Sequence, residues 1–117
     1  MYRSIYQQMT AETTANIRDN ERRAFERSIE LLKLARAAGR GSRESVDALL
    51  FVSRLWSILM EDLAHSGNGL PDVLKASLIS IGIWVLTRSE DIRQGKSDDF
   101  SALIEVSQTV CGGLAAA

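Results

Sequence analysis

The chain has few of the residues that build covalent or metal-based sites. Its 117 residues include a single Cys, Cys111, and a single His, His65. One Cys forms neither an internal disulfide nor a four-thiolate zinc site, and one His excludes a His-rich metal site. Cys111 is therefore expected to be a small apolar residue of a core, and His65 to lie at the C-terminal end of a helix.

Long apolar segments are also missing. The longest apolar run covers residues 78–86 and is interrupted by Ser80 and Gly82. A helix that crosses a bilayer needs about 20 apolar residues. The first residues contain no apolar stretch of the length found in a signal peptide. These features predict a cytoplasmic protein that does not insert into a membrane.

Charge of one sign is not in excess, because 14 Lys and Arg residues face 15 Asp and Glu residues. Proteins that bind nucleic acid usually carry a basic excess, so nucleic-acid binding is the less favoured interpretation. Residues 1–43 are nevertheless basic and the remainder is acidic. Either the two parts dock on each other, or a basic helix binds an acidic partner or RNA. We favour docking, because acidic residues alternate with the arginines between Arg18 and Arg27.

Proline and glycine are scarce within the apolar patterns and mark their ends. Pro71 is the only proline, and most of the eight glycines fall where a helical pattern stops. Apolar residues recur at three- and four-residue steps between these points, which is typical of amphipathic helices. The predicted helices cover residues 14–38, 42–64, 71–94 and 98–110.

Several residues fit the ends of these helices. Gly39 is a suitable C-terminal cap, Ser42 and Ser97 are suitable N-terminal caps, and Pro71 suits a first helical position. The segment 78–86 also has the composition of a buried strand, but it lacks strand alternation and both its flanks read as helical. We therefore interpret it as helix.

The fold class predicted from these patterns is all-α. Short connections imply antiparallel neighbours, so we expect a small single-domain bundle of about four helices over residues 1–117, with loose ends at 1–13 and 112–117. Segment 71–94 is apolar on nearly every side, and we expect it to be the central, buried helix.

No pattern of residues predicts catalysis or a cofactor. The glycine-rich turns at 39–42 and 66–69 lack the spacing of a phosphate-binding loop. Adjacent carboxylates, such as Glu61 and Asp62, point in different directions on a helix and cannot act as a pair. We therefore expect no enzyme activity, no cofactor and no metal. What remains is a surface that binds another protein.

The candidate protein-binding surface is an apolar groove on the bundle. Bundles of this kind bind helices or peptides in such grooves. The two tryptophans either fill the core or anchor a partner, and one residue can do both at the floor of a groove. The predicted groove residues are Trp56, Leu59, Trp84, Phe100 and Ile104.

Four stretches of the sequence, in order and with similar spacing, resemble one known family. These stretches, which accompany an N-terminal Tyr, are residues 27–32, 55–63, 78–86 and 97–107. The sequence is similar over nearly its whole length to the FlaF flagellar biosynthesis regulators of alphaproteobacteria.

The resemblance implies a cytoplasmic protein that is needed to make the flagellar filament. It implies that flagellin is the partner, with the chain acting as a chaperone or secretion factor that couples flagellin synthesis to export. The family acts opposite a second regulator, FlbT, which restrains flagellin translation. The alternatives are a post-transcriptional regulator of flagellin mRNA, for which the arginines of segment 14–38 are the best candidates, and an adaptor that joins FlbT to flagellin.

Overall fold

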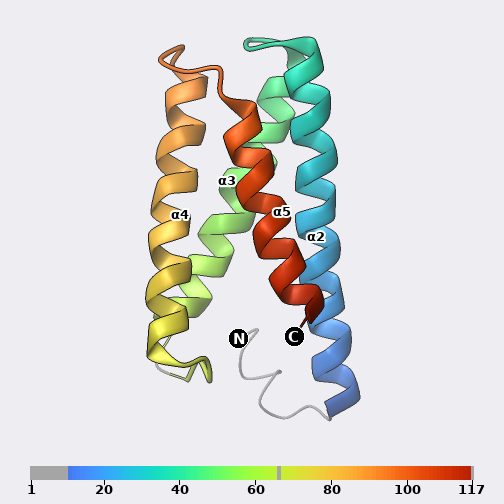
Figure 1. The fold of residues 1–117 in the computed structure, drawn as a ribbon, viewed down its shortest axis with the longest axis vertical. Helices are drawn as coiled ribbons and strands as arrows, with labels where there is room; N and C mark the ends of the chain where they lie inside the picture. The colour runs from blue at the N-terminus through green and yellow to red at the C-terminus, as the bar shows by residue number, and fades with distance from the viewer. Residues whose placement is uncertain (1–10, 66, 117) are drawn as a thin grey trace.

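This computed structural model describes residues 11–65 and 67–116. These residues form a bundle of four α-helices that run alternately up and down (Figure 1). The helices are α2 (Ala11–Ala38), α3 (Arg43–Ala64), α4 (Asp72–Arg93) and α5 (Phe100–Ala116). The described residues contain no strand, and residues 78–86 are helical. The prediction of an all-α bundle is confirmed.

The turn between α2 and α3 follows from two residues. Gly39 adopts a φ of +94°, which favours glycine, and its N–H donates to the Ala35 carbonyl (2.8 Å). Ser42 precedes α3, and its Oγ accepts a hydrogen bond from the Ser45 N–H (3.1 Å). Both predicted caps are confirmed.

The ends of the last two helices differ from the prediction. Pro71 precedes α4 as its N-cap instead of occupying the first helical position. At α5 the cap is Asp99, whose Oδ1 accepts from the Ala102 N–H (3.1 Å), while the predicted cap Ser97 accepts from the Asp99 N–H (3.2 Å). Ser97 and Asp99, two positions apart, thus both have side chains that can cap a helix, and the sequence alone does not show which of them caps α5.

α5 also extends further than predicted. We expected it to end at Val110, but it continues through Gly112 and Gly113 to Ala116. Of the ends expected to be loose, residues 1–10 and 117 lie outside the described residues, whereas 11–13 and 112–116 belong to α2 and α5.

The core lies between α2, α3 and α5. Trp56 of α3 is its largest fully buried side chain, and its ring meets that of Phe25 edge to face, with centroids 5.6 Å apart. Other core residues are Leu32, Ala35, Ala48, Leu49, Val52, Val85, Ile92, Phe100, Leu103 and Ile104. Most of these residues lie on α2, α3 and α5, and α2 packs against both of the other two helices.

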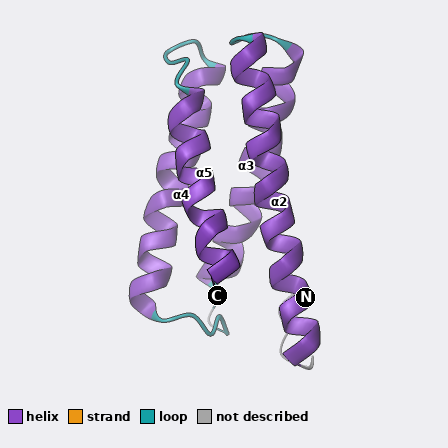
Figure 2. Cartoon of the chain, turned by 45° about the vertical axis from the view of Figure 1, so that its right-hand side comes forward, coloured by secondary structure: helices purple, strands orange, loops and turns teal. Residues whose placement is uncertain are grey.

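The prediction that segment 71–94 is the central helix is wrong. α4 packs against α3 and scarcely touches α5, whereas α2 packs against both α3 and α5. The overlap of α4 with α5 in Figure 2 is one of projection. The buried residues of α4 are Gly82, Val85, Ser89 and Ile92. Ile83 on another side is 56% exposed. A helix that is apolar on several sides can lie at the centre of a bundle, but other helices cover only one side of α4.

Gly82 sets the distance between α4 and α3. A Cβ at this position would lie 2.5 Å from Met60 Sδ and 3.1 Å from Trp56 Cε3. Both separations are shorter than van der Waals contact, so the absence of a side chain lets the two helices meet. The glycine thus has a packing role inside a helix where glycine is otherwise unfavourable.

Gly82→Ala is expected to destabilise the protein, with Gly112→Ala as its matched control. Overpacking costs about 1–3 kcal/mol, which exceeds the gain of up to about 1 kcal/mol from replacing a helical glycine by alanine. At Gly112 nothing lies within 4 Å of the new Cβ, so that variant receives the gain alone. Urea unfolding measures both, and equal stabilisation by the two substitutions would contradict the packing role.

Candidate functional site

The structure places the five predicted groove residues in two different environments. Trp56, Phe100 and Ile104 are at most 4% exposed and belong to the core. Leu59 and Trp84 are partly exposed and pack against the edge of that core. The five side chains therefore do not form one open surface. Contact of Leu59 and Trp84 with a partner stays a prediction.

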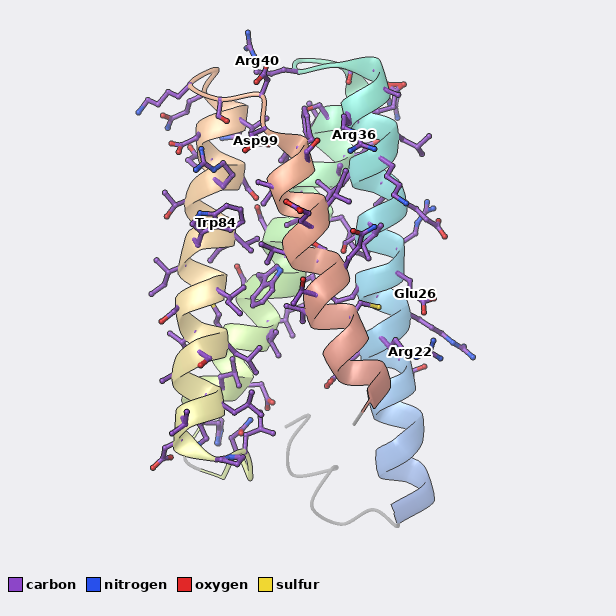
Figure 3. All side chains as sticks on the ribbon, viewed as in Figure 1. Arg22, Glu26, Arg36, Arg40, Trp84 and Asp99 are labelled. Atoms are coloured by element: carbon purple, nitrogen blue, oxygen red, sulfur yellow. The ribbon has the colours of Figure 1, made fainter. Side chains whose placement is uncertain are left out.

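Trp84 lies on α4 (Figure 3), and its ring contacts Arg88 of the same helix. The guanidinium carbon of Arg88 is 5.5 Å from the centroid of the Trp84 ring, a distance suited to a cation–π contact. The Nε atom of Arg88 is buried and has no hydrogen-bond partner. This side of α4 therefore carries an aromatic ring and a cation next to each other.

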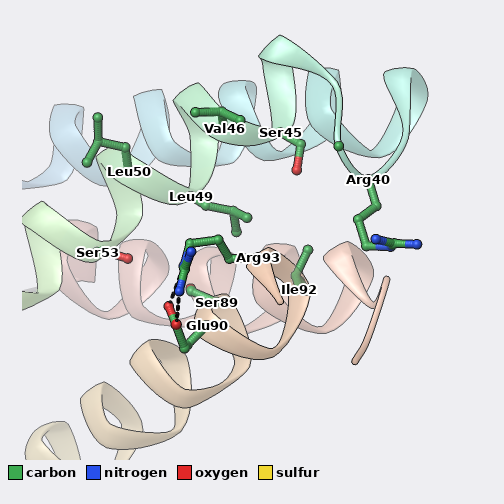
Figure 4. A pocket seen from close by; sticks show the side chains of 11 residues that line it. Arg40, Ser45, Val46, Leu49, Leu50, Ser53, Ser89, Glu90, Ile92 and Arg93 are labelled. Atoms are coloured by element: carbon green, nitrogen blue, oxygen red, sulfur yellow. Dashed lines mark hydrogen bonds and ion pairs between the residues drawn. The ribbon is translucent and has the colours of Figure 1, made fainter. Parts of the chain in front are cut away.

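A groove lies between α3 and α4 (Figure 4). It has a volume of about 270 Å³ and lies where the first turns of α3 face the last turns of α4. Its apolar lining consists of Val46, Leu49, Leu50 and Ile92. Leu49 and Ile92 are buried, while Val46 is 60% exposed and Leu50 is 48% exposed. The groove thus has a buried apolar base and an exposed apolar wall.

Sequence reasoning missed this groove. Val46, Leu49 and Leu50 lie on an apolar stripe of segment 42–64, which is the part of the signal that the sequence contains. Periodicity does not show which residues of such a stripe are buried and which are exposed. The contribution of α4 could not be found, since it depends on which side of α4 meets α3.

Ser89 is an unsatisfied polar group in the lining of the groove. Its side chain is 2% exposed, and its Oγ has no hydrogen-bond partner in the structure. A buried hydroxyl without a partner is unfavourable by about 1–3 kcal/mol. A polar group that enters the groove would remove this cost.

Glu90 and Arg93 form the charged wall on α4. Arg93 Nε donates to Glu90 Oε2 (2.8 Å), a second bond joins Arg93 Nη2 to Oε1, and Gln94 Nε2 also donates to Oε1 (2.9 Å). The hydrogen bonds from Arg93, opposed by partial desolvation and aided by Gln94, lower the pKa of Glu90 to about 2. The two charges therefore neutralise each other across the whole physiological pH range.

Arg40 lies at the end of the groove, in the turn before α3. Its guanidinium packs over the backbone of Gly95, which has a φ of +81°, and an added Cβ there would lie 3.0 Å from Arg40 Nη1. Within residues 11–65 and 67–116, no carboxylate forms an ion pair with Arg40. Figure 4 shows it beyond the Glu90–Arg93 pair, at the opposite end from Leu50. It is the uncompensated charge among the groove residues.

Two of the α2 arginines that the RNA alternative depends on, Arg22 and Arg27, have partners on their own helix. Arg22 pairs with Glu26 (2.7 Å) and Arg27 with Glu30 (3.0 Å). Toward α5, Arg36 donates to the Ser101 hydroxyl (3.2 Å). The acidic residues between these arginines thus form local pairs along α2.

Cys111 lies where α5 packs against α2. Its Sγ donates to the Arg22 carbonyl (3.8 Å), and burial, with Glu26 nearby, raises the pKa of the thiol. A thiol with a raised pKa stays protonated at neutral pH and is a poor nucleophile. The residue behaves as the small apolar group that was predicted.

The described part of the chain contains neither a membrane-spanning helix nor a metal-binding cluster. No helix there is long and apolar enough to cross a membrane. No three His, Cys, Asp or Glu side chains in the same residues gather in a way that would hold a metal ion.

Comparison with known proteins identifies the family. A family model described as flagellar protein FlaF matches residues 2–114. The chain belongs to the FlaF family. Neither the curated proteins nor the solved structures contain a match to it. The resemblance seen in four stretches of the sequence is confirmed, and this FlaF-family bundle is related to flagella through that membership.

The two tryptophans of this FlaF-family chain are expected to respond differently to truncation. Trp56→Ala removes a fully buried ring and is expected to cost about 3–5 kcal/mol of unfolding free energy. Trp84→Ala removes a partly exposed ring and is expected to cost less, leaving a folded protein by circular dichroism. If Trp84→Ala unfolds as readily as Trp56→Ala, then Trp84 is a core residue in energetic terms.

The pKa of Glu90 can be measured by following its carboxyl carbon in an NMR titration. We expect a pKa of about 2 and a return toward the ordinary value of 4.5 in Arg93→Gln. Because the folded pKa is lowered, the stabilisation from this pair is present above pH 4.5 and is lost as the pH falls toward 2. A pKa near 4.5 in the wild-type protein would show that the pair does not persist in solution.

Proposed function

We propose that this FlaF-family chain binds flagellin in the cytoplasm, holds it for secretion and couples its synthesis to filament assembly. Two findings support the proposal. The family is a flagellar one. The bundle also has an open apolar groove between α3 and α4, and this groove is the observation that carries the proposal. The proposed function involves no catalysis, no cofactor and no metal.

The groove suits a helical or extended segment of another protein. Amphipathic segments bind such grooves by inserting apolar side chains from one face. A volume of about 270 Å³ accommodates a few side chains and is smaller than most small-molecule pockets. A chaperone that covers an apolar face of flagellin would prevent its premature assembly, and the exposed Val46 and Leu50 offer such a covering surface.

Titration calorimetry with the cognate flagellin monomer tests this function. We expect saturable binding with a Kd in the micromolar range or tighter, which corresponds to about −8 kcal/mol or more favourable. Both proteins are first shown to be folded by circular dichroism. The absence of binding would contradict the proposal.

Two parallel titrations distinguish the other functions. Binding to FlbT as well as to flagellin would indicate an adaptor. A shift of flagellin leader RNA in a gel, lost steeply as salt rises, would indicate a regulator of the message. The local ion pairs of Arg22 and Arg27 make the RNA function the less favoured of these.

A further inference from the structure

We propose that the α3–α4 groove is a binding site for a peptide segment of flagellin in which an acidic side chain lies beside one or two apolar side chains. The inference rests on the proposed function and specifies the chemistry of its site. Three features of the groove lead to it: an apolar wall, an unsatisfied hydroxyl and an unpaired cation.

The apolar part of the groove determines where the apolar side chains of the segment bind. Val46 and Leu50 are one turn apart on α3, and they stand over the buried Leu49 and Ile92. An apolar side chain that enters here contacts both helices at once and covers both exposed residues. Burial of apolar surface then supplies the affinity, at roughly 25 cal/mol per Å² before the costs of association.

The charges of the groove determine the sign of the polar side chain. Three charged residues line the groove, and Glu90 and Arg93 neutralise each other. Arg40 remains, close to the first turn of α3, where the helix dipole also favours an anion. Glu44 lies in that turn but does not line the groove. The complementary group on a partner is therefore a carboxylate.

Ser89 adds a polar contact within the apolar part. Its Oγ is buried in the lining without a partner, although a hydroxyl both donates and accepts. A polar atom of the bound segment, such as a backbone carbonyl or N–H, would satisfy it. The groove thus offers apolar contact, one hydroxyl and one cation, in an arrangement that fits a short amphipathic acidic segment.

The test measures the affinity of the full-length chain for flagellin monomer by titration calorimetry with four surface variants. Arg40→Glu and Leu50→Asn alter the groove. Arg54→Glu and Ile58→Asn are the matched controls, because both residues are exposed on α3 and neither lines the groove. Each variant is first shown to retain the wild-type circular dichroism and melting temperature to within a few degrees.

We expect both groove variants to weaken binding about tenfold or more, and both controls to change it less than about twofold. Raising the salt concentration should weaken wild-type binding more than that of Arg40→Glu, because the variant lacks the attractive charge. Ser89→Ala should leave the fold unchanged and weaken binding about threefold or more.

The outcomes separate this inference from the function on which it rests. If wild-type protein binds flagellin and the groove variants bind equally well, the inference is overturned while the proposed function stands. Loss of affinity in Leu50→Asn without any change in Arg40→Glu overturns the acidic part. A wild-type protein that does not bind flagellin overturns both. If the groove variants instead abolish a dimer seen by light scattering, the groove is covered by a second copy, which also overturns the inference.

Discussion

The close contact of α4 with α3 at Gly82 is the constraint on how α4 joins the rest of the bundle. α2, α3 and α5 enclose a core around Trp56 and Phe25, and α4 joins that core through one side only. Since no side chain separates the helices at Gly82, α4 lies deep against Met60 and Trp56 at its middle. Val85 and Ile92 on the same side of α4 are buried, whereas Val73 and Ile83 on its other sides are exposed.

The ends of the helices could be predicted because they depend on local chemistry. Gly39 and Ser42 form their caps with groups within four residues, so the sequence contains all the partners. The error at Ser97 has the same origin, because Asp99 competes for the same role two residues later. The family could also be predicted, since its signal is spread over four ordered stretches rather than one motif.

The position of α4 and the groove could not be predicted because they depend on pairing between helices. Segment 71–94 is apolar on several sides. The periodicity of a sequence shows how much of a helix surface is apolar, but it does not show which neighbouring helix covers that surface. Trp56, Phe100 and Ile104 were predicted to line a groove, with core packing as the alternative for the tryptophan, and all three are buried. Leu50, which is also apolar, is 48% exposed. Tertiary contacts, which residue type does not reveal, decide both outcomes.

Exposed apolar side chains are a liability for an isolated protein and a binding surface for one that receives another chain. In this bundle Val46 and Leu50 of α3 are exposed in a groove that Arg40 and the Glu90–Arg93 pair also line. In the proposed complex, an incoming segment would have to match the charge of Arg40 as well as the apolar surface. A segment with a basic residue at that point would be disfavoured. The fixed charge beside Val46 and Leu50 would thus add specificity that apolar contact alone does not supply.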